Sequence, residues 1–452
     1  MGHQINAQRE YELLRQRMDH SVSPVPDSPA IRKILELLYS PEEAEFARRI
    51  PVLPTRLSEL ARRLEWPEDE LRDKLTDLAR RGLIFDCEKG GERYYSLPPV
   101  VGGLFEYVLM RTRAGVPMEE LSRLFTEYLE NEEVLRAVYT GETPFARAYV
   151  REDALPEGDH AEILDYERIG RLLETASVIS IGLCPCRHKN SHLGTACDRP
   201  QRTCISLNAG AEAMIHSGIS ERIDAREALR VIDECKAAGL AQVGDNVQRS
   251  IGFVCNCCRC CCTLTRGVRT LGINHAIVSS NWIPEIDADR CVACGRCEAA
   301  CPVQAVAVEG LKGGKSEKGE KGLKGLAVIA AGLCLGCGVC YSQCRSGAIR
   351  MKPRAQRVFT PETTFDMVGH MAIERGKVAE VLFEDPERLS LRAIGRLLRL
   401  LEKSPPWKAA MAVRPLRSAF LNAIFAVSKD VREEKARIRR EAASRNADRQ
   451  GK

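Results

Sequence analysis

The first hundred residues alternate between helical and strand-like hydrophobic patterns. Apolar positions recur at helical spacing in three segments, residues 31–39, 57–66 and 67–83. The next stretch, LIFDCEKGGERYYSL, has apolar and aromatic residues on both sides of Gly90-Gly91. Two such runs around a glycine pair predict a hairpin. Three helices followed by a hairpin therefore make up the expected N-terminal unit.

This order of elements resembles the winged helix-turn-helix. We therefore expect a winged-helix-like domain over residues 1–100, followed by a helical connector over 101–176. The segment 67–81 carries five acidic residues against four basic ones, and its amino-terminal end is the acidic end. A surface that binds duplex DNA needs a basic face to neutralise phosphate. The sequence thus makes DNA an unlikely partner and favours protein docking.

The middle of the chain contains two strand patterns that each end in cysteine. The apolar run VISIGL, residues 178–183, precedes Cys184, and VQRSIGFV precedes the stretch CNCCRCCC at 255–262. Between them, residues 224–239 predict an amphipathic helix that begins with a capping box. Two strands linked by a helix can end at one edge of a sheet. We expect a cysteine-rich α/β domain over 177–285 in which both groups of thiols meet.

The last hundred residues have a helical and basic pattern. Residues 389–403 and 414–429 are apolar stretches interrupted or flanked by basic side chains. From residue 388 to the end, 17 Lys and Arg stand against 6 Asp and Glu, although the net charge of the chain is only +5. Such helices suit an anionic membrane surface or an acidic partner, and equally suit packing onto the protein's own core. We expect a helical basic region over 353–452, with peripheral membrane contact left open.

Composition places the chain among folded proteins of several domains. A chain of 452 residues is longer than a single hydrophobic core usually accommodates. Its composition, with 44% hydrophobic and 29% charged residues, is typical of globular proteins. The amino-terminal residues are polar where a secretory signal is apolar, and we expect no segment to span a bilayer. We therefore expect an α+β multidomain protein of the cytoplasm, at the inner membrane face if its basic helices dock there. In that reducing compartment the 20 cysteines favour metal binding over disulfides.

Two stretches late in the chain repeat one cysteine spacing. Residues 291–302 read CVACGRCEAACP and residues 334–344 read CLGCGVCYSQC, so C-x2-C-x2-C-x3-C occurs twice. In this motif three close thiolates hold one 4Fe-4S cluster, and the fourth cysteine ligates the cluster of the other half. Cluster one is thus assigned to Cys291, Cys294, Cys297 and Cys344, and cluster two to Cys334, Cys337, Cys340 and Cys301. A pair of zinc ribbons is the alternative, although zinc seldom uses this triplet.

On these motifs, residues 286–352 resemble a bacterial dicluster ferredoxin domain. The resemblance implies two 4Fe-4S clusters, with a short hairpin and a helix in each half. Two features depart from the family pattern. Arg345 follows Cys344 where the family usually has proline, and LKGGKSEKGEKGLKG at 311–325 is a longer insert than compact ferredoxins carry. The glycines and lysines of the insert suit a solvated spacer or a contact with an acidic partner.

Ten further cysteines lie in two groups upstream of the repeat. The first group, spaced C-x-C-x10-C-x6-C, consists of Cys184, Cys186, Cys197 and Cys204. Its four thiols suit another 4Fe-4S cluster or a zinc ion, with His188 or His192 as a substitute ligand. From CNCCRCCC the first candidate ligands are Cys255, Cys257, Cys258 and Cys261. The spacing leaves open whether the region holds one or two further iron-sulfur clusters, or a tract of redox-buffering thiols. Cys87 and Cys235 are expected to be packing residues.

No motif marks a nucleotide-binding or hydrolytic site, since the sequence has no Walker loop, dinucleotide fingerprint or HExxH. Taken whole, the chain resembles multidomain ferredoxin-type proteins of anaerobes. We therefore expect an electron-transfer protein that relays electrons through two or more 4Fe-4S clusters to redox partner proteins. Two alternatives stay open: a redox-sensing winged-helix regulator, and an oxidoreductase subunit with a catalytic cluster in the cysteine-rich region.

Overall fold

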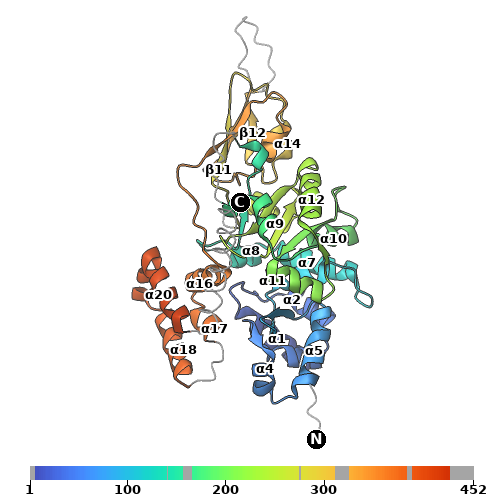
Figure 1. The fold of residues 1–452 in the computed structure, drawn as a ribbon, viewed down its shortest axis with the longest axis vertical. Coiled ribbons are helices and arrows are strands. Elements are labelled where there is room, and N and C mark those ends of the chain that lie inside the picture. Colours follow the sequence, from blue (N-terminus) through green and yellow to red (C-terminus); the bar gives the residue numbers. More distant parts are fainter. Residues whose placement is uncertain are drawn as a thin grey trace, which may run out of the picture.

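The computed structural model describes residues 6–139, 141–155, 165–273, 276–310, 325–383 and 389–427. Figure 1 shows the N-terminal helices at one end, a larger sheet with helices in the middle, and a small unit of short strands at the opposite end. Helices and separate sheets together give a mixed α and β structure. Nearly all of the lysine-rich insert, and the tail beyond residue 427, lie outside the described residues.

The N-terminal unit contains each element that the hydrophobic pattern predicts there. Its helices are α1 (Ala7–Asp19), α2 (Pro29–Leu38), α3 (Pro41–Ala47), α4 (Leu57–Leu64) and α5 (Glu68–Arg80). Its strands are β1 (Thr55–Arg56), β2 (Phe85–Lys89) and β3 (Glu92–Ser96), in the order β1-β3-β2. The predicted helices correspond to α2, α4 and α5. The predicted hairpin is β2–β3, and Gly90 and Gly91 form its turn with φ of 61° and 78°.

The segment expected to be a purely helical connector also contributes a strand. It contains the π-helical turn η1 (Val100–Leu104), the helices α6 (Phe105–Leu109), α7 (Met118–Leu129), α8 (Glu132–Tyr139) and α9 (Ile169–Thr175), and the 3-10 turns η2 (Glu152–Ala154) and η4 (Asp165–Glu167). Between α8 and η2, however, β4 (Ala146–Ala148) joins the large sheet. Three residues are too few to produce a detectable alternation, so the pattern missed this strand.

The large sheet has seven strands in the order β10-β4-β8-β9-β6-β5-β7. Besides β4 these are β5 (Ile179–Leu183), β6 (Arg202–Leu207), β7 (Glu221–Ile223), β8 (Ala241–Asp245), β9 (Phe253–Cys257) and β10 (Ile277–Val278). The helices that follow its strands are α10 (Pro185–His192), α11 (Asn208–His216), α12 (Ala225–Ala237) and α13 (Thr263–Leu271). The two predicted cysteine-bearing strands are β5 and β9, and β6 lies between them. The predicted helix is α12, with Asp224 capping the amide of Glu227.

A buried ion pair connects three distant parts of the chain. Arg147 on β4 lies 2.7 Å from the carboxylate of Glu167, and both side chains are almost wholly buried. Arg147 also donates to the hydroxyl of Thr360, and Asn281 donates to Glu167. A buried charge without its partner is strongly destabilising, so the sheet, the segment before α9 and the chain around Thr360 must assemble together.

The small unit at the far end has its strands paired between the two cysteine motifs. Its elements are β11 (Trp282–Ile286), α14 (Arg296–Ala300), β12 (Val306–Glu309), β13 (Leu326–Ile329), α15 (Val339–Gln343) and β14 (Ile349–Pro353). β11 pairs with β14 and β12 pairs with β13, both antiparallel. The expectation of a hairpin within each half is therefore wrong. A cysteine loop and a helix separate the two strands of each half, and each strand pairs with one from the other half.

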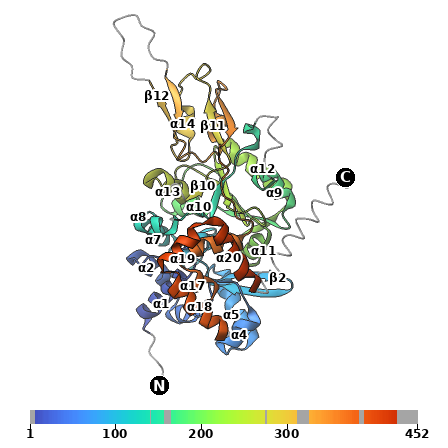
Figure 2. The same cartoon turned by 90° about the vertical axis from the view of Figure 1, so that its left-hand side faces the viewer.

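The C-terminal helices pack beside the N-terminal unit (Figure 2). They are α16 (Thr364–Glu374), α17 (Val378–Leu382), α18 (Leu389–Leu401), α19 (Pro405–Ala412) and α20 (Arg414–Val427). Lys377, between α16 and α17, donates to the carbonyl oxygen of Ser21 over 3.2 Å. On α18, Leu397 and Leu400 are 57% and 73% exposed, so part of the predicted apolar face has no cover among the described residues. None of the helices described is long and apolar enough to cross a membrane.

Candidate metal centres

The fourth cysteine of the second motif lies at the loop of the first. Cys291, Cys294, Cys297 and Cys344 line one small cavity. Gly295, with φ of 73°, turns the loop into α14 immediately after Cys294, and Cys344 follows directly after α15. The structure therefore brings together the four thiols assigned to cluster one. Arg345, which replaces the usual proline, is exposed.

The corresponding exchange occurs at the second loop. Burial, with smaller contributions from the nearby Cys301 and Cys334, raises the pKa of the Cys337 thiol to about 12. The pKa of Cys340 is also raised by burial and by the same neighbours. Because Cys301 from the first motif influences both thiols, it lies within electrostatic reach of the second loop. The thiols assigned to cluster two thus share one buried region.

Backbone amides hydrogen-bond to these sulfurs. The amides of Ala305, Gly336 and Ala348 donate to Sγ atoms at 3.2, 3.4 and 3.3 Å, and their acceptors are Cys301, Cys334 and Cys344 respectively. Amide donors stabilise negative charge on a thiolate and help to set the potential of an iron-sulfur cluster. Four thiols at each loop, with amide donors among them, fit two 4Fe-4S groups.

Six of the ten upstream thiols form a continuous row across the large sheet, which we call the six-thiol row. Its members, in order of contact, are Cys204, Cys255, Cys257, Cys262, Cys186 and Cys184. The register explains their proximity, because Ile205 of β6 pairs with Val254 of β9 and so places Cys204 beside Cys255. Cys184 follows β5, and Cys262 caps α13. Three adjacent strands therefore deliver their thiols to one place.

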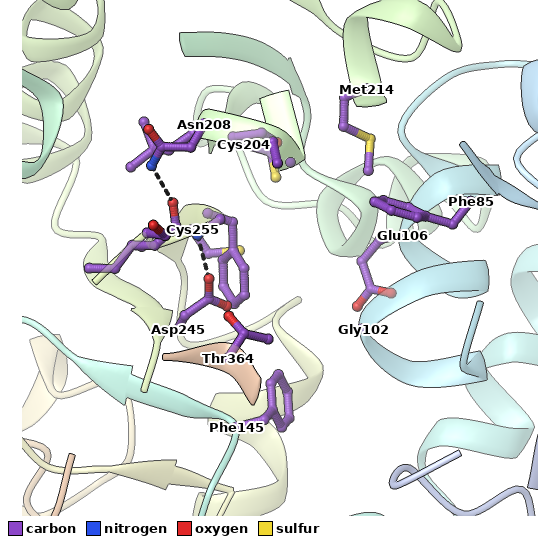
Figure 3. Close-up of a pocket in the computed structure, with 18 of the residues that line it drawn as sticks. Phe85, Gly102, Glu106, Phe145, Cys204, Asn208, Met214, Asp245, Cys255 and Thr364 are labelled. Atoms are coloured by element: carbon purple, nitrogen blue, oxygen red, sulfur yellow. Dashed lines mark hydrogen bonds between the residues drawn. The ribbon is translucent and has the colours of Figure 1, made fainter. Parts of the chain in front are cut away.

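The six-thiol row lines one wall of a cavity of about 1370 Å³. Figure 3 shows this cavity with Cys204 and Cys255 on one side and Phe85 and Glu106 on another. Its walls come from the N-terminal hairpin, the connector, the large sheet and α16. Cys87 also lines it, so this residue faces a cavity rather than only packing in a core. A cavity of this size holds a drug-sized or larger molecule.

Two carboxyl groups in the cavity have pKa values raised above their ordinary range. Burial, and to a lesser extent the nearby thiols of Cys186 and Cys255, raises the pKa of Glu106 to about 8. Burial likewise raises the pKa of Asp245 to about 7. The amide of Gly103 donates to Glu106 over 2.8 Å and fixes that carboxyl. The cavity therefore offers two proton-carrying groups close to the sulfurs.

The other four upstream thiols form a separate, compact set, which we call the four-thiol group. It consists of Cys197, Cys258, Cys260 and Cys261, and all of its Sγ atoms lie within 4.8 Å of one another. Among the described residues this is the one set of three or more potential metal ligands that close together. Cys197 comes from the loop after α10, and the others come from the turn between β9 and α13.

The sequence identified most of these thiols but grouped them differently from the structure. Cys184, Cys186 and Cys204 join Cys255 and Cys257, whereas Cys197 joins Cys258 and Cys261. The candidate metal ligands chosen from the sequence did not include Cys260 and Cys262. A signal for Cys262 was its position immediately before the helical pattern that starts at Thr263. Cys235 is fully buried on α12 and belongs to neither set.

The histidines and arginines near these thiols have different roles. His188 lies 2.7 Å from the carbonyl oxygen of Leu109 through Nδ1, and its other ring nitrogen contacts Thr112 and His192, so the ring joins α10 to the connector. Arg187 is fully buried and donates to the carbonyl oxygen of Asn256 over 3.0 Å. Its guanidinium lies within electrostatic reach of thiols from both sets. It supplies positive charge where thiolates accumulate.

Gly336 provides a test of the second cysteine loop. Its φ is +66°, and a Cβ there would overlap the carbonyl oxygen of Trp282. We expect Gly336→Ala to prevent closure of the loop and to lower iron by roughly four atoms per chain, because an L-residue at this φ also costs about 1–2 kcal/mol. Gly332→Ala is the control, since nothing lies within 4 Å of that Cβ. The iron content per chain is measured on both variants after anaerobic purification. Equal iron in the two variants would contradict this account of the loop.

Glu106 predicts a pH-dependent stability. A carboxyl whose pKa is raised to about 8 on folding contributes most at low pH, and that contribution is lost as the pH rises from about 4.5 towards 8. Glu106→Gln keeps an acceptor for Gly103 but cannot ionise. Relative to wild type, we expect its free energy of unfolding to increase by up to a few kcal/mol between pH 5 and pH 8.5. Glu119→Gln, at an exposed position on α7, is the control and should show no such trend. Denaturant titrations at both pH values measure the free energies of unfolding.

Comparison with known proteins supports iron-sulfur binding at the small unit. Residues 283–306, which include the first cysteine loop, match the family model of a 4Fe-4S binding domain. No curated protein matches the chain, and no solved structure matches it. Together with the clustered cysteines, the match supports an iron-sulfur protein with a redox or electron-transfer role.

Proposed function

We propose that the protein transfers electrons through two 4Fe-4S clusters in its small unit, a dicluster ferredoxin-like domain, to or from the thiol-rich centre of the chain. One observation carries this proposal: each cysteine motif supplies three thiols to its own loop, while its last thiol lies at the loop of the other motif. This exchange is characteristic of two-cluster ferredoxins. When bound, the clusters supply one-electron redox chemistry, and the chain positions and insulates them.

The two loops face different surroundings, which suggests a direction for the relay. At the first loop Cys294 is exposed and the apolar side chain of Val292 is 63% exposed. An exposed apolar residue beside a cluster suits transient docking of a redox partner. At the second loop Cys337 and Cys340 are buried. Electrons would therefore exchange with a partner protein at cluster one and with the rest of the chain at cluster two.

Hydrogen bonds attach the second loop to the large sheet. The amide of Arg151 donates to the carbonyl oxygen of Cys337 over 3.3 Å, and its guanidinium donates to Ser342 on α15 over 2.6 Å. The same guanidinium donates to the carbonyl oxygen of Leu240, next to β8. A buried arginine with partners on both sides holds the two parts in one arrangement, which electron transfer over a fixed distance requires.

The regulator alternative is less well supported by the N-terminal unit. Its hairpin contacts α11. Arg93 on β3 contacts the ring of His216 on α11 and also pairs with the buried Asp86 on β2. The strand pair that would serve as a wing is thus in contact with the protein itself. The first turn of α5 carries Glu68, Asp69 and Glu70, which disfavours approach to phosphates. We propose that this unit, winged-helix-like in its order of elements, is an internal docking domain.

Cysteine variants test the proposed exchange of ligands. In anaerobically purified protein we expect Cys297→Ser and Cys344→Ser to abolish one and the same low-temperature EPR signal. Cys340→Ser and Cys301→Ser should abolish the other. Cys235→Ala, a core cysteine outside every set, should leave both signals and the iron content unchanged. Dithionite titration should deliver about two electrons to the small unit, one per cluster. Protein that contains only zinc, or a Cys344→Ser variant that retains both signals, would refute the proposal.

The cavity favours a second candidate function, an oxidoreductase whose catalytic cluster is held by the six-thiol row. A cluster that faces a cavity can bind a small ligand at iron, whereas a fully enclosed cluster cannot. If this function holds, cyanide should shift an EPR signal that Cys255→Ser abolishes and Cys297→Ser retains. A spectrum that cyanide leaves unchanged would reject the catalytic role and leave electron transfer standing.

A further inference from the structure

We propose that the four-thiol group, Cys197 with Cys258, Cys260 and Cys261, binds a single tetrahedrally coordinated metal ion, which we expect to be zinc, and not an iron-sulfur cluster. The sulfur-to-sulfur distances carry the proposal. Sγ of Cys261 lies 3.8 Å from Sγ of Cys197 and 3.7 Å from Sγ of Cys260. Four thiolates at the usual Zn–S length of about 2.3 Å form a tetrahedron with edges of about 3.8 Å.

A cubane requires a wider arrangement of thiols. It holds four irons and four sulfides between the thiolates, so its ligands lie farther apart than those of one ion. The eight thiols of the small unit form no set as tight as the four-thiol group. Within one chain, the structure therefore contains widely spaced thiol sets where the cluster motif occurs and one narrow set where it does not. The narrow set suits one ion with a closed, all-sulfur coordination.

Local hydrogen bonds hold the thiols in this arrangement. The amide of Cys261 donates to Sγ of Cys258 over 3.3 Å, and the hydroxyl of Thr265 donates to the carbonyl oxygen of Cys258 over 2.9 Å. These contacts form a tight turn at the start of α13. In the other loop, the guanidinium of Arg199 donates to the carbonyl oxygen of Ala238 over 2.7 Å, which holds the loop after Cys197 against the end of α12. Ligands on two separately fixed loops are typical of a structural metal site.

The site would stabilise the junction with the small unit. Arg259 lies between Cys258 and Cys260, and its guanidinium donates to the carbonyl oxygen of Ala299 over 2.8 Å. Ala299 is at the end of α14, two residues before Cys301, a proposed ligand of cluster two. An ion bound by the residues on both sides of Arg259 fixes the backbone from which this side chain extends. Its loss should therefore loosen the contact between the turn and α14.

Element-specific measurements on the full-length protein test the site. We expect about one zinc per chain, and X-ray absorption at the zinc edge should show four sulfur neighbours at about 2.3 Å. Cys260→Ser removes the exposed ligand and should abolish this zinc while the iron content stays unchanged; unchanged iron also shows that the variant is folded. Cys197→Ser, on the other loop, should have the same effect. Cys87→Ser, a cysteine outside the group, is the control and should retain the zinc.

One other metal content would support the single-ion site, and two would overturn it. One mononuclear iron in place of zinc, lost in the same two variants, also supports a single-ion site, because the coordination is the same. Loss of about four irons in Cys260→Ser would overturn the proposal in favour of a cluster. Metal content that neither variant changes would overturn it in favour of free thiols. As an independent readout, hydrogen exchange at residues 296–301 should become faster in Cys260→Ser and not in Cys87→Ser.

Discussion

The pairing register of β6 with β9 is the constraint on which the thiol-rich centre depends. Side chains alternate between the two faces of a strand, so a shift of one residue would turn Cys204 or Cys255 to the opposite face and break the six-thiol row. The register is supported beyond the ladder itself. Asn256 donates from its side chain to the carbonyl oxygen of Thr203 across the same two strands, and Gln242 on β8 donates to Asn256 in turn. Buried polar contacts of this kind disfavour a slipped pairing because slippage would leave them unsatisfied.

Charge is the second requirement of such a centre. Thiolates are negative, and their accumulation in a buried region is costly unless positive charge or amide donors lie nearby. The chain provides both. Arg187 is buried between the two upstream sets, and Lys189, two residues later, is buried against Thr126. In the small unit, backbone amides donate to Sγ of Cys301 and Cys344, and the buried Arg151 lies within electrostatic reach of Cys337 and Cys340. Both regions therefore combine amide donors with buried arginine to offset the negative charge of the thiolates.

The sequence predicted the local elements better than their pairing. Strong periodicity identified α2, α5 and β5, and the glycine pair identified the hairpin, because these signals are local. The strand β4 and the pairing of β11 with β14 depend on contacts between distant residues and leave no local trace. The candidate sites followed the same rule. A motif with known ligand exchange allowed the small-unit thiols to be assigned, whereas spacing alone put Cys197 with Cys204, and the fold separates them.

The neighbouring residues Cys257 and Cys258 belong to different sets, the first to the six-thiol row and the second to the four-thiol group. Cys261 and Cys262 are divided between the two sets in the same way, so a single peptide bond joins the two centres at each of two points. A deletion or insertion at either point would displace ligands of both, so neither could be transplanted, lost or redesigned as an independent module. Protein engineering and evolution can therefore change the spacing of the ligands in the two centres only together.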